Sequence, residues 1–210
     1  MIKSELRSTV LNRLQKYDKT ARFHNRVIDA NIEKVLNETY NALFLASPLS
    51  IQRFTKRYGY ATPIAVSLEV ATSLYYSTLP VTNGIVPFPD KASGVRRIST
   101  PTQGAIAFYP MDEREMDLIA NGSYYDYVTS KVGYVVRQDR VEYHNMPASV
   151  IASGVRMDIV VPFSEYADTD IVLVPEIQSQ EGKDLVDLVV EKMMAIPPVD
   201  TIDDNADKTE

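Results

Sequence analysis

Residues 25–47, NRVIDANIEKVLNETYNALFLAS, decide the architecture of this 210-residue chain. Apolar side chains recur there every three or four positions, as on one face of an α-helix, and no Gly or Pro interrupts them. The stripe consists of Ile28, Ile32, Val35, Leu36, Thr39 and Leu43. Tyr40 and Phe44 make it wider than a lone surface helix needs. We therefore predict a long helix that has Asn25 as its N-cap, ends before Pro48 and packs on more than one side.

Helices are also predicted at both ends of the folded region. In 4–16, the residues at helical spacing are Leu6, Val10, Leu11 and Leu14. In 183–196, one face carries Leu185, Leu188, Val189, Met193 and Ile196. The pair Pro197-Pro198 stops this last helix, because proline cannot continue it. The stretch 50–58 reads either as a third short helix or as part of a linker.

The middle of the chain changes to the short runs that are typical of strands. Predicted strands are 64–70, 74–79, 96–99, 105–109, 124–128, 132–137, 140–143, 155–161 and 171–174. Gln138 and Asp139 form a two-residue hairpin turn without the favoured glycine. A long loop at 80–94 and an acidic helix near 111–121 interrupt the strands. Because helices and strands do not alternate regularly, a doubly wound parallel sheet is disfavoured.

These elements predict an α+β protein. Its N-terminal and C-terminal helices form a helical bundle, and an antiparallel β-rich module is inserted between them. The predicted parts are an N-terminal helical part (1–58), the β-rich module with one helix (59–175), a C-terminal helix that packs on the helical part (176–197), and a flexible acidic tail (198–210).

The net charge of the chain changes sign at nearly the same place where the helix-like pattern gives way to strand-like runs. Up to Tyr60 there are eleven Lys and Arg against five Asp and Glu, whereas the remainder has eleven against twenty-three. A molecule with a basic end and an acidic end meets copies or partners in a fixed orientation. If the C-terminal helix packs on the basic helices, part of this opposition is satisfied within one subunit. The densest basic cluster is Arg53, Lys56 and Arg57, which is either a solvated face or a contact with an acidic neighbour. We predict that it faces an acidic surface.

Catalytic signatures are missing from the sequence. The chain has no Cys, which excludes disulfides, thiolate metal sites and a Cys nucleophile. His24 and His144 belong to no catalytic motif, and the zinc-hydrolase and phosphate-loop patterns do not occur. The acidic tail lacks the glycine and glutamate of a calcium loop. We therefore predict no cofactor, no metal and no enzyme activity, with a hydrolase that uses paired carboxylates as the remote alternative.

Neither a membrane span nor a secretion signal is expected. No apolar run reaches the roughly 18 residues that a span needs, and the first residues alternate charged with apolar side chains. The absence of Cys fits synthesis in a reducing cytoplasm. Sequence-specific binding to DNA is not expected either, because the acidic remainder of the chain repels phosphates.

Four blocks of the sequence carry a resemblance to a known family. They are RFHNRVIDANIEKVLNETYNALF at 22–44, GVRRIST at 94–100, FYPMDEREMDLI at 108–119 and PPVDTIDDNAD at 197–207. In order and spacing, the blocks resemble the head–tail connector proteins, also called adaptor or ring proteins, of short-tailed or crAss-like tailed bacteriophages.

The resemblance implies a structural virion protein, made in the cytoplasm of the bacterial host. It implies a homo-oligomeric ring, commonly of twelve copies, that lies below the portal protein, binds further tail or ring proteins and gives DNA a passage. The loop at 80–94 and the tail become candidate arms that order on assembly. Candidate assembly contacts are Arg53, Lys56, Arg57, Arg96, Arg97, Asp203, Asp204 and Asp207. Another tail or cargo-type virion protein outside the ring is the alternative.

Overall fold

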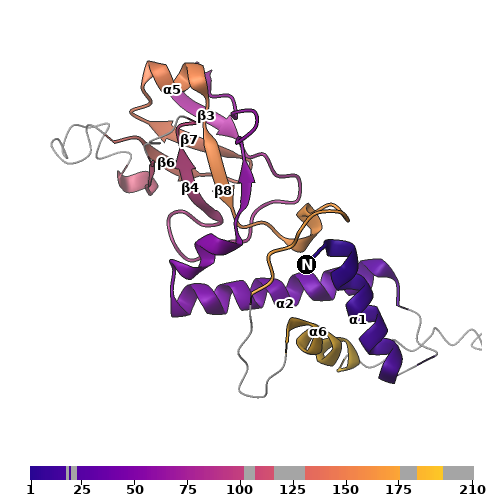
Figure 1. The fold of residues 1–210 in the computed structure, drawn as a ribbon. Helices are drawn as coiled ribbons and strands as arrows, with labels where there is room; N and C mark the ends of the chain where they lie inside the picture. The colour runs from indigo at the N-terminus through magenta and orange to yellow at the C-terminus, as the bar shows by residue number, and fades with distance from the viewer. Residues whose placement is uncertain (18, 20–22, 102–106, 116–130, 176–183, 196–210) are drawn as a thin grey trace, which may run out of the picture.

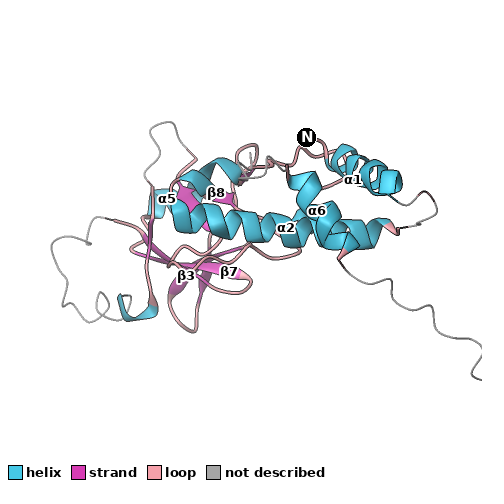
Figure 2. Ribbon diagram, turned by 90° about the horizontal axis from the view of Figure 1, so that it is seen from below, coloured by secondary structure: helices cyan, strands magenta, loops and turns pink. Residues whose placement is uncertain are grey.

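A computed structural model describes residues 1–17, 19, 23–101, 107–115, 131–175 and 184–195. The helices are α1 (Lys3–Tyr17), α2 (Asn25–Ala46), α5 (Ala148–Ser153) and α6 (Leu185–Met194), with short 3₁₀ helices η1 (Ser50–Phe54) and η2 (Phe163–Glu165). Three helices, α1, α2 and α6, lie together below a β-rich part in Figure 1, and Figure 2 views the molecule from the side of these helices. The predicted α+β class is confirmed.

The long helix α2 forms from the sequence stretch that predicted it. Its buried face consists of Ile28, Ile32, Val35, Leu36, Tyr40 and Phe44, so most of the predicted stripe is confirmed. Thr39 and Leu43, which were also predicted, are only half-buried. The predicted cap is wrong by one residue: Asn25 is the first helical residue, and His24, with extended backbone, precedes it. The helix ends at Ala46, before Pro48, as expected.

The C-terminal helix α6 packs on α1 and α2. Its first turn is closed by a capping box, in which the side chains of Asp184 and Asp187 each accept a hydrogen bond from the other's backbone amide. Arg13 of α1 pairs with both carboxylates, and its nitrogen lies 3.2 Å from Asp184. At the other end of α6, Lys192 pairs with Glu38 of α2. Burial of its apolar face and these ion pairs therefore both fix α6 against α1 and α2.

The strands form two small sheets. Strands β1 (Lys56–Tyr58), β8 (Arg156–Ile159) and β4 (Val95–Ser99) make an antiparallel sheet in the order β1-β8-β4. The second sheet has the order β2-β3-β7-β6-β5, from β2 (Ser67–Glu69), β3 (Leu74–Thr78), β7 (Arg140–His144), β6 (Gly133–Val136) and β5 (Tyr109–Pro110). It is antiparallel except for the β5–β6 pair. The predicted hairpin at Gln138-Asp139 joins β6 to β7 and is confirmed.

Several predicted elements differ from the structure. The short helix predicted within 50–58 is confirmed only over Ser50–Phe54, as η1, because β1 follows it and joins the β-rich part. The strand predicted at 64–70 shrinks to β2, and Val70 is 86 % exposed, because this hairpin extends beyond the core. The segment 171–174 forms only an isolated bridge from Ile171 to Ile2. Helix α5 was not predicted.

The loop at 80–94 has no regular structure, as predicted, but it is not a free arm. Val86 and Phe88 are buried, and the amide of Val86 donates a 3.0 Å hydrogen bond to the carbonyl of Val160. The ring of Phe88 stacks on that of Phe44 in α2, with centroids 4.9 Å apart. The loop is already packed against the core in a single chain, so the expectation that it orders on assembly is wrong.

Other predictions fall outside the described residues. These are the strand at 124–128, the acidic tail and most of the helix near 111–121, of which only 113–115 is described as helical. In the part of the chain that the structure describes, no helix is both long enough and apolar enough to cross a bilayer.

Candidate assembly surface

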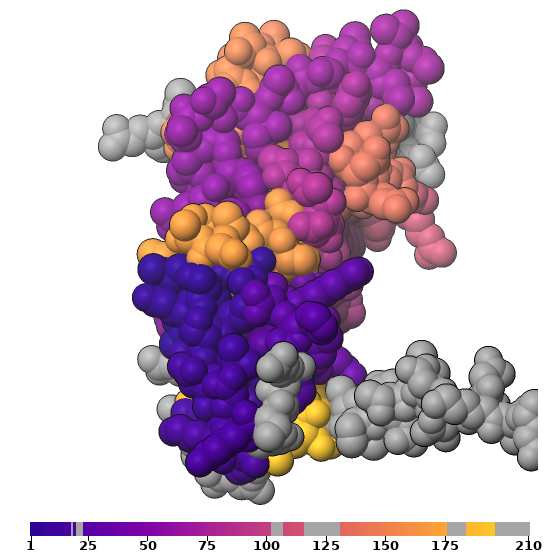
Figure 3. All heavy atoms as spheres, turned by 90° about the vertical axis from the view of Figure 1, so that its right-hand side faces the viewer, coloured from indigo at the N-terminus to yellow at the C-terminus, as the bar shows by residue number. Residues whose placement is uncertain are grey.

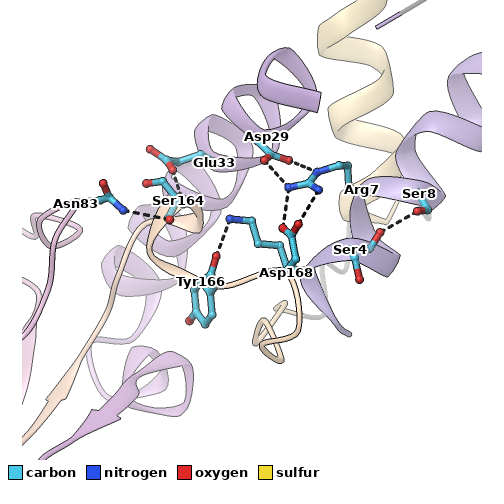
Figure 4. A network of polar contacts seen from close by, with 10 residues as sticks. Ser4, Arg7, Ser8, Asp29, Glu33, Asn83, Ser164, Tyr166 and Asp168 are labelled. Carbon is cyan, nitrogen blue, oxygen red and sulfur yellow. Dashed lines mark hydrogen bonds and ion pairs between the residues drawn. The ribbon is translucent and has the colours of Figure 1, made fainter. Parts of the chain in front are cut away.

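A junction segment, residues 163–173, lies between the helices and the β-rich part, and Figure 3 shows it as an orange band. Arg7 of α1 binds it to the helices, as Figure 4 shows. The guanidinium donates two 2.7 Å hydrogen bonds to Asp29 of α2 and one of 3.0 Å to Asp168 of the junction segment. The hydrogen bond to Asp29 is the main cause that raises the pKa of Arg7, so this charge is fixed.

Further contacts make the junction segment a fixed part of the fold. Lys3 is buried and donates a 2.7 Å hydrogen bond from Nζ to the carbonyl of Tyr166. Glu33 of α2 accepts a 2.8 Å hydrogen bond from the amide of Ser164 (Figure 4). Charge-assisted hydrogen bonds of this length are among the stronger polar contacts in proteins. The segment can therefore serve as one wall of a binding surface.

An open groove of about 500 Å³ lies between β1 and the junction segment. Its lining residues are Gln52, Arg53, Thr55, Lys56, Arg57, Tyr166, Asp170, Ile171 and Leu173. All three residues of the predicted basic cluster line this groove. Sequence reasoning placed them together because they are neighbours in the chain, but it missed the opposite wall, which comes more than a hundred residues later.

Lys56 is satisfied inside the chain. Its Nζ lies 2.9 Å from the carboxylate of Asp170 and 5.1 Å from the ring centroid of Tyr166. The hydrogen bond from Lys56, followed by one from the amide of Ala167, lowers the pKa of Asp170. Burial, and then the charge of Asp170, raises the pKa of the Tyr166 hydroxyl to about 12. The acidic group that Lys56 faces is thus its own chain's Asp170.

Arg53 and Arg57 remain available to a partner. Both are exposed, and neither has an ion pair within the described residues. The guanidinium of Arg57 lies 5.6 Å from the ring centroid of Tyr60. Across the groove, Ile171 is 66 % exposed and Leu173 is 38 % exposed. The groove therefore combines two arginines that form no ion pair within the described residues with exposed apolar surface.

The sheet face next to the groove adds another arginine. Arg57 in β1 and Arg97 in β4 both stand opposite Asp158 in the central strand β8. Side chains at such paired positions lie on the same face of a sheet. The hydroxyl of Tyr60 donates a 2.9 Å hydrogen bond to Asp158, which fixes the carboxylate between the two arginines. Arg97 is exposed and extends the basic surface beyond the groove.

Arg96 is not part of this surface. Its side chain is only 8 % exposed and binds Asp90 through Nη1, at 2.9 Å from one carboxylate oxygen. The guanidinium also lies 5.2 Å from the ring centroid of Phe44 and 5.6 Å from that of Phe88. This burial withdraws Arg96 from contact with a neighbouring molecule. The other candidates, Asp203, Asp204 and Asp207, lie outside the described residues.

The exposed residues of the far wall belong to an apolar run that is visible in the sequence. The run Ile171, Val172, Leu173 alternates, with Val172 buried and its two neighbours exposed. The continuous apolar run predicted a strand at 171–174, whereas the segment forms one isolated bridge and leaves two apolar side chains uncovered.

The groove presents charged and apolar side chains that suit it to binding. Its one carboxylate, Asp170, is already paired with Lys56. Within the described residues, no group of three or more His, Cys, Asp or Glu side chains is placed to hold a metal ion. Comparison of the chain with known protein families, with curated proteins and with solved structures gave no match. Function is therefore inferred from the surface chemistry and from the sequence resemblance.

The Lys56–Asp170 pair predicts an acid-sensitive contribution to stability. Because the pKa of Asp170 is lowered in the folded state, its carboxylate stabilises the fold above the unfolded pKa of about 4, and this is lost as the pH falls through the lower folded pKa. Asp170→Asn should reduce the free energy of unfolding by about 1 kcal/mol at pH 7. Urea titrations should show this difference closing as the pH falls below the unfolded pKa of about 4. Asp139→Asn, at an exposed turn, is the control, and a difference that is independent of pH would contradict the prediction.

Proposed function

We propose that the protein is a structural virion subunit whose copies form a closed ring at the head–tail junction of a tailed phage. The observation that carries the proposal is the pair Arg53 and Arg57, exposed and without a carboxylate partner within the described chain, beside the apolar side chains of the groove. Ring closure needs a heterologous interface, in which one patch meets a different patch of the next copy. The groove supplies one such patch. The four sequence blocks that resemble connector proteins give the proposal its place in the virion.

In this proposal, α1, α2 and α6 act as a helical bundle, and the antiparallel β-rich module is inserted between α2 and α6. Packing of α6 on both other helices supports this arrangement. In our proposal the boundary between the two parts lies between η1 and β1, which is supported by the pairing of β1 with β8.

The ring, with twelve copies in our proposal, lies below the portal protein and binds further tail or ring proteins. DNA passes through it without sequence-specific contacts, for which the net charge of −6 is suitable because phosphates are repelled. The subunit is made in the host cytoplasm, acts in the virion and has no catalytic role.

Charge reversal of the groove tests the proposal. The double variant R53E/R57E should reduce the ring population at least about tenfold, because like charges across an interface cost several kcal/mol. Native mass spectrometry and negative-stain microscopy, with and without the portal protein, measure this. The monomer should keep its circular dichroism, since both side chains are exposed, and should lose at most about 1 kcal/mol of stability, because R57E sets a like charge opposite Asp158 across the sheet.

A matched control separates the groove from the general effect of charge. R26E/K34E makes the same change in net charge at two exposed residues of α2 and should leave assembly unaffected. Unchanged assembly of R53E/R57E would exclude the groove as the interface. A wild-type protein that stays monomeric and does not bind the portal would overturn the proposed function.

A further inference from the structure

The strand that borders the groove has one unpaired side. β1 is the end strand of the β1-β8-β4 sheet, and within the described residues its backbone hydrogen bonds go to β8 alone. The end strand of a sheet leaves a row of amide and carbonyl groups that another extended chain can use. A groove of about 500 Å³ lies beside this edge. That volume falls in the range of about 300–1,000 Å³ that is typical of ligand sites.

The walls of the groove define what can occupy it. Arg53 and Arg57 favour a negatively charged ligand, because neither forms an ion pair among the described residues. Exposed Ile171 and Leu173 require apolar contact as well. A nucleic-acid backbone would satisfy the arginines but would leave this apolar surface uncovered. An extended peptide satisfies both walls, because alternate side chains of a strand point to opposite sides.

The junction segment keeps the far wall in place before anything binds. The hydroxyl of Tyr40 in α2 donates a 2.9 Å hydrogen bond to the carbonyl of Leu173. The amide of Val172 donates one of 2.9 Å to the carbonyl of Met1. The ion pair with Lys56 holds Asp170 in place. A site whose walls are already held loses little entropy when a ligand enters.

We propose that the groove binds an extended acidic peptide segment of a partner protein, which adds as a strand to the free side of β1. Its carboxylates pair with Arg53 and Arg57, and its apolar side chains cover Ile171 and Leu173. This mode, in which backbone hydrogen bonds provide affinity and side-chain contacts provide specificity, is known for peptides that extend a sheet. The inference deepens the proposed function and rests on it for the biological role of the contact.

Peptide binding to the full chain tests the inference. The probe is a fluorescein-labelled synthetic peptide of alternating Asp and Ile, measured by fluorescence anisotropy at low ionic strength. We expect saturable binding that R53E/R57E weakens at least about tenfold and that R26E/K34E leaves within about twofold. A peptide with Lys in place of Asp should not bind. Equal binding to both double variants, or no binding to the wild type, would overturn the inference.

Two further probes test the strand addition and the class of partner. N-methylation of alternate peptide amides removes backbone donors along one side of the strand but keeps every charge, so it should weaken binding at least about tenfold. Retained affinity would show a contact by charge alone and would contradict strand addition. Tighter binding of a single-stranded DNA oligonucleotide than of the peptide would overturn the assignment to a peptide partner. If ring assembly depends on Arg53 and Arg57 while no peptide binds, the proposed function survives and this inference fails.

Discussion

Gly59→Ala is expected to lower the free energy of unfolding by about 3 kcal/mol. Gly59 follows β1 directly and has a φ of +76°, a left-handed conformation that costs an L-residue about 1–2 kcal/mol. A Cβ there would also lie 2.6 Å from the carbonyl oxygen of Val155. That oxygen cannot move aside cheaply, because it accepts a 2.9 Å hydrogen bond from the amide of Ile64, and Val155 donates one back. The backbone strain and the steric overlap of the new Cβ therefore both contribute to the loss of stability.

Gly84→Ala separates the two effects. Gly84 has a similar φ of +83°, but no atom lies within 4 Å of the added Cβ. Only the conformational cost remains, so this variant should lose about 1 kcal/mol. Urea unfolding of both variants measures the difference, with an unchanged m-value as the sign that the two-state transition is retained. Equal losses would mean that the contact with Val155 relaxes and that our account of the turn is wrong.

The sequence predicted elements best where one period ran long. In α2 the spacing of Ile28, Ile32 and Leu36 on one buried face left no competing pattern. Short alternating runs were less informative, because alternation indicates two different faces but not whether anything covers either one. The exposure of Val70 shows the consequence, since the strand pattern is present and the core ends before it.

Ion pairs between residues far apart in the sequence neutralise part of the charge asymmetry between the two halves of the chain. Arg7 and Arg13 from the basic half pair with Asp168 and Asp187 from the acidic half. Together with Lys56 and Asp170, these contacts satisfy part of the opposition within one chain. The sequence showed both totals but not the pairing. Of the basic half, Arg53 and Arg57 remain exposed beside the groove.

Two adjacent arginines show why the candidate surface was only partly predictable. Arg96 and Arg97 are chemically identical in the sequence, yet the first is buried and the second is exposed. The pairing of β4 with β8 shifts register between Val95 and Arg97, so simple alternation does not fix which side chain turns inward. The decision depends on Asp90 and on the two rings that receive the guanidinium, which no local pattern reveals.

Arg96→Ala should consequently lower the free energy of unfolding by about 3 kcal/mol. Removal of one partner from a buried ion pair costs about 3–5 kcal/mol, and the lower end applies because Asp90 stays partly open to water. The contacts of the guanidinium with the rings of Phe44 and Phe88 are lost as well. Arg97→Ala is the matched control and should change stability by less than about 0.5 kcal/mol, since it removes the same side chain from an exposed site.

Urea unfolding and native mass spectrometry together distinguish a core residue from an assembly contact. R96A should destabilise the monomer, and R96M/D90N should recover part of that loss, because replacing both members of a buried pair leaves no unpaired charge. R97A should keep full monomer stability. If R96A instead unfolds like the wild type but fails to form rings, the guanidinium acts between subunits, and the placement of Arg96 against Asp90 is wrong. Loss of stability without a separate loss of assembly is the result that the buried pair requires.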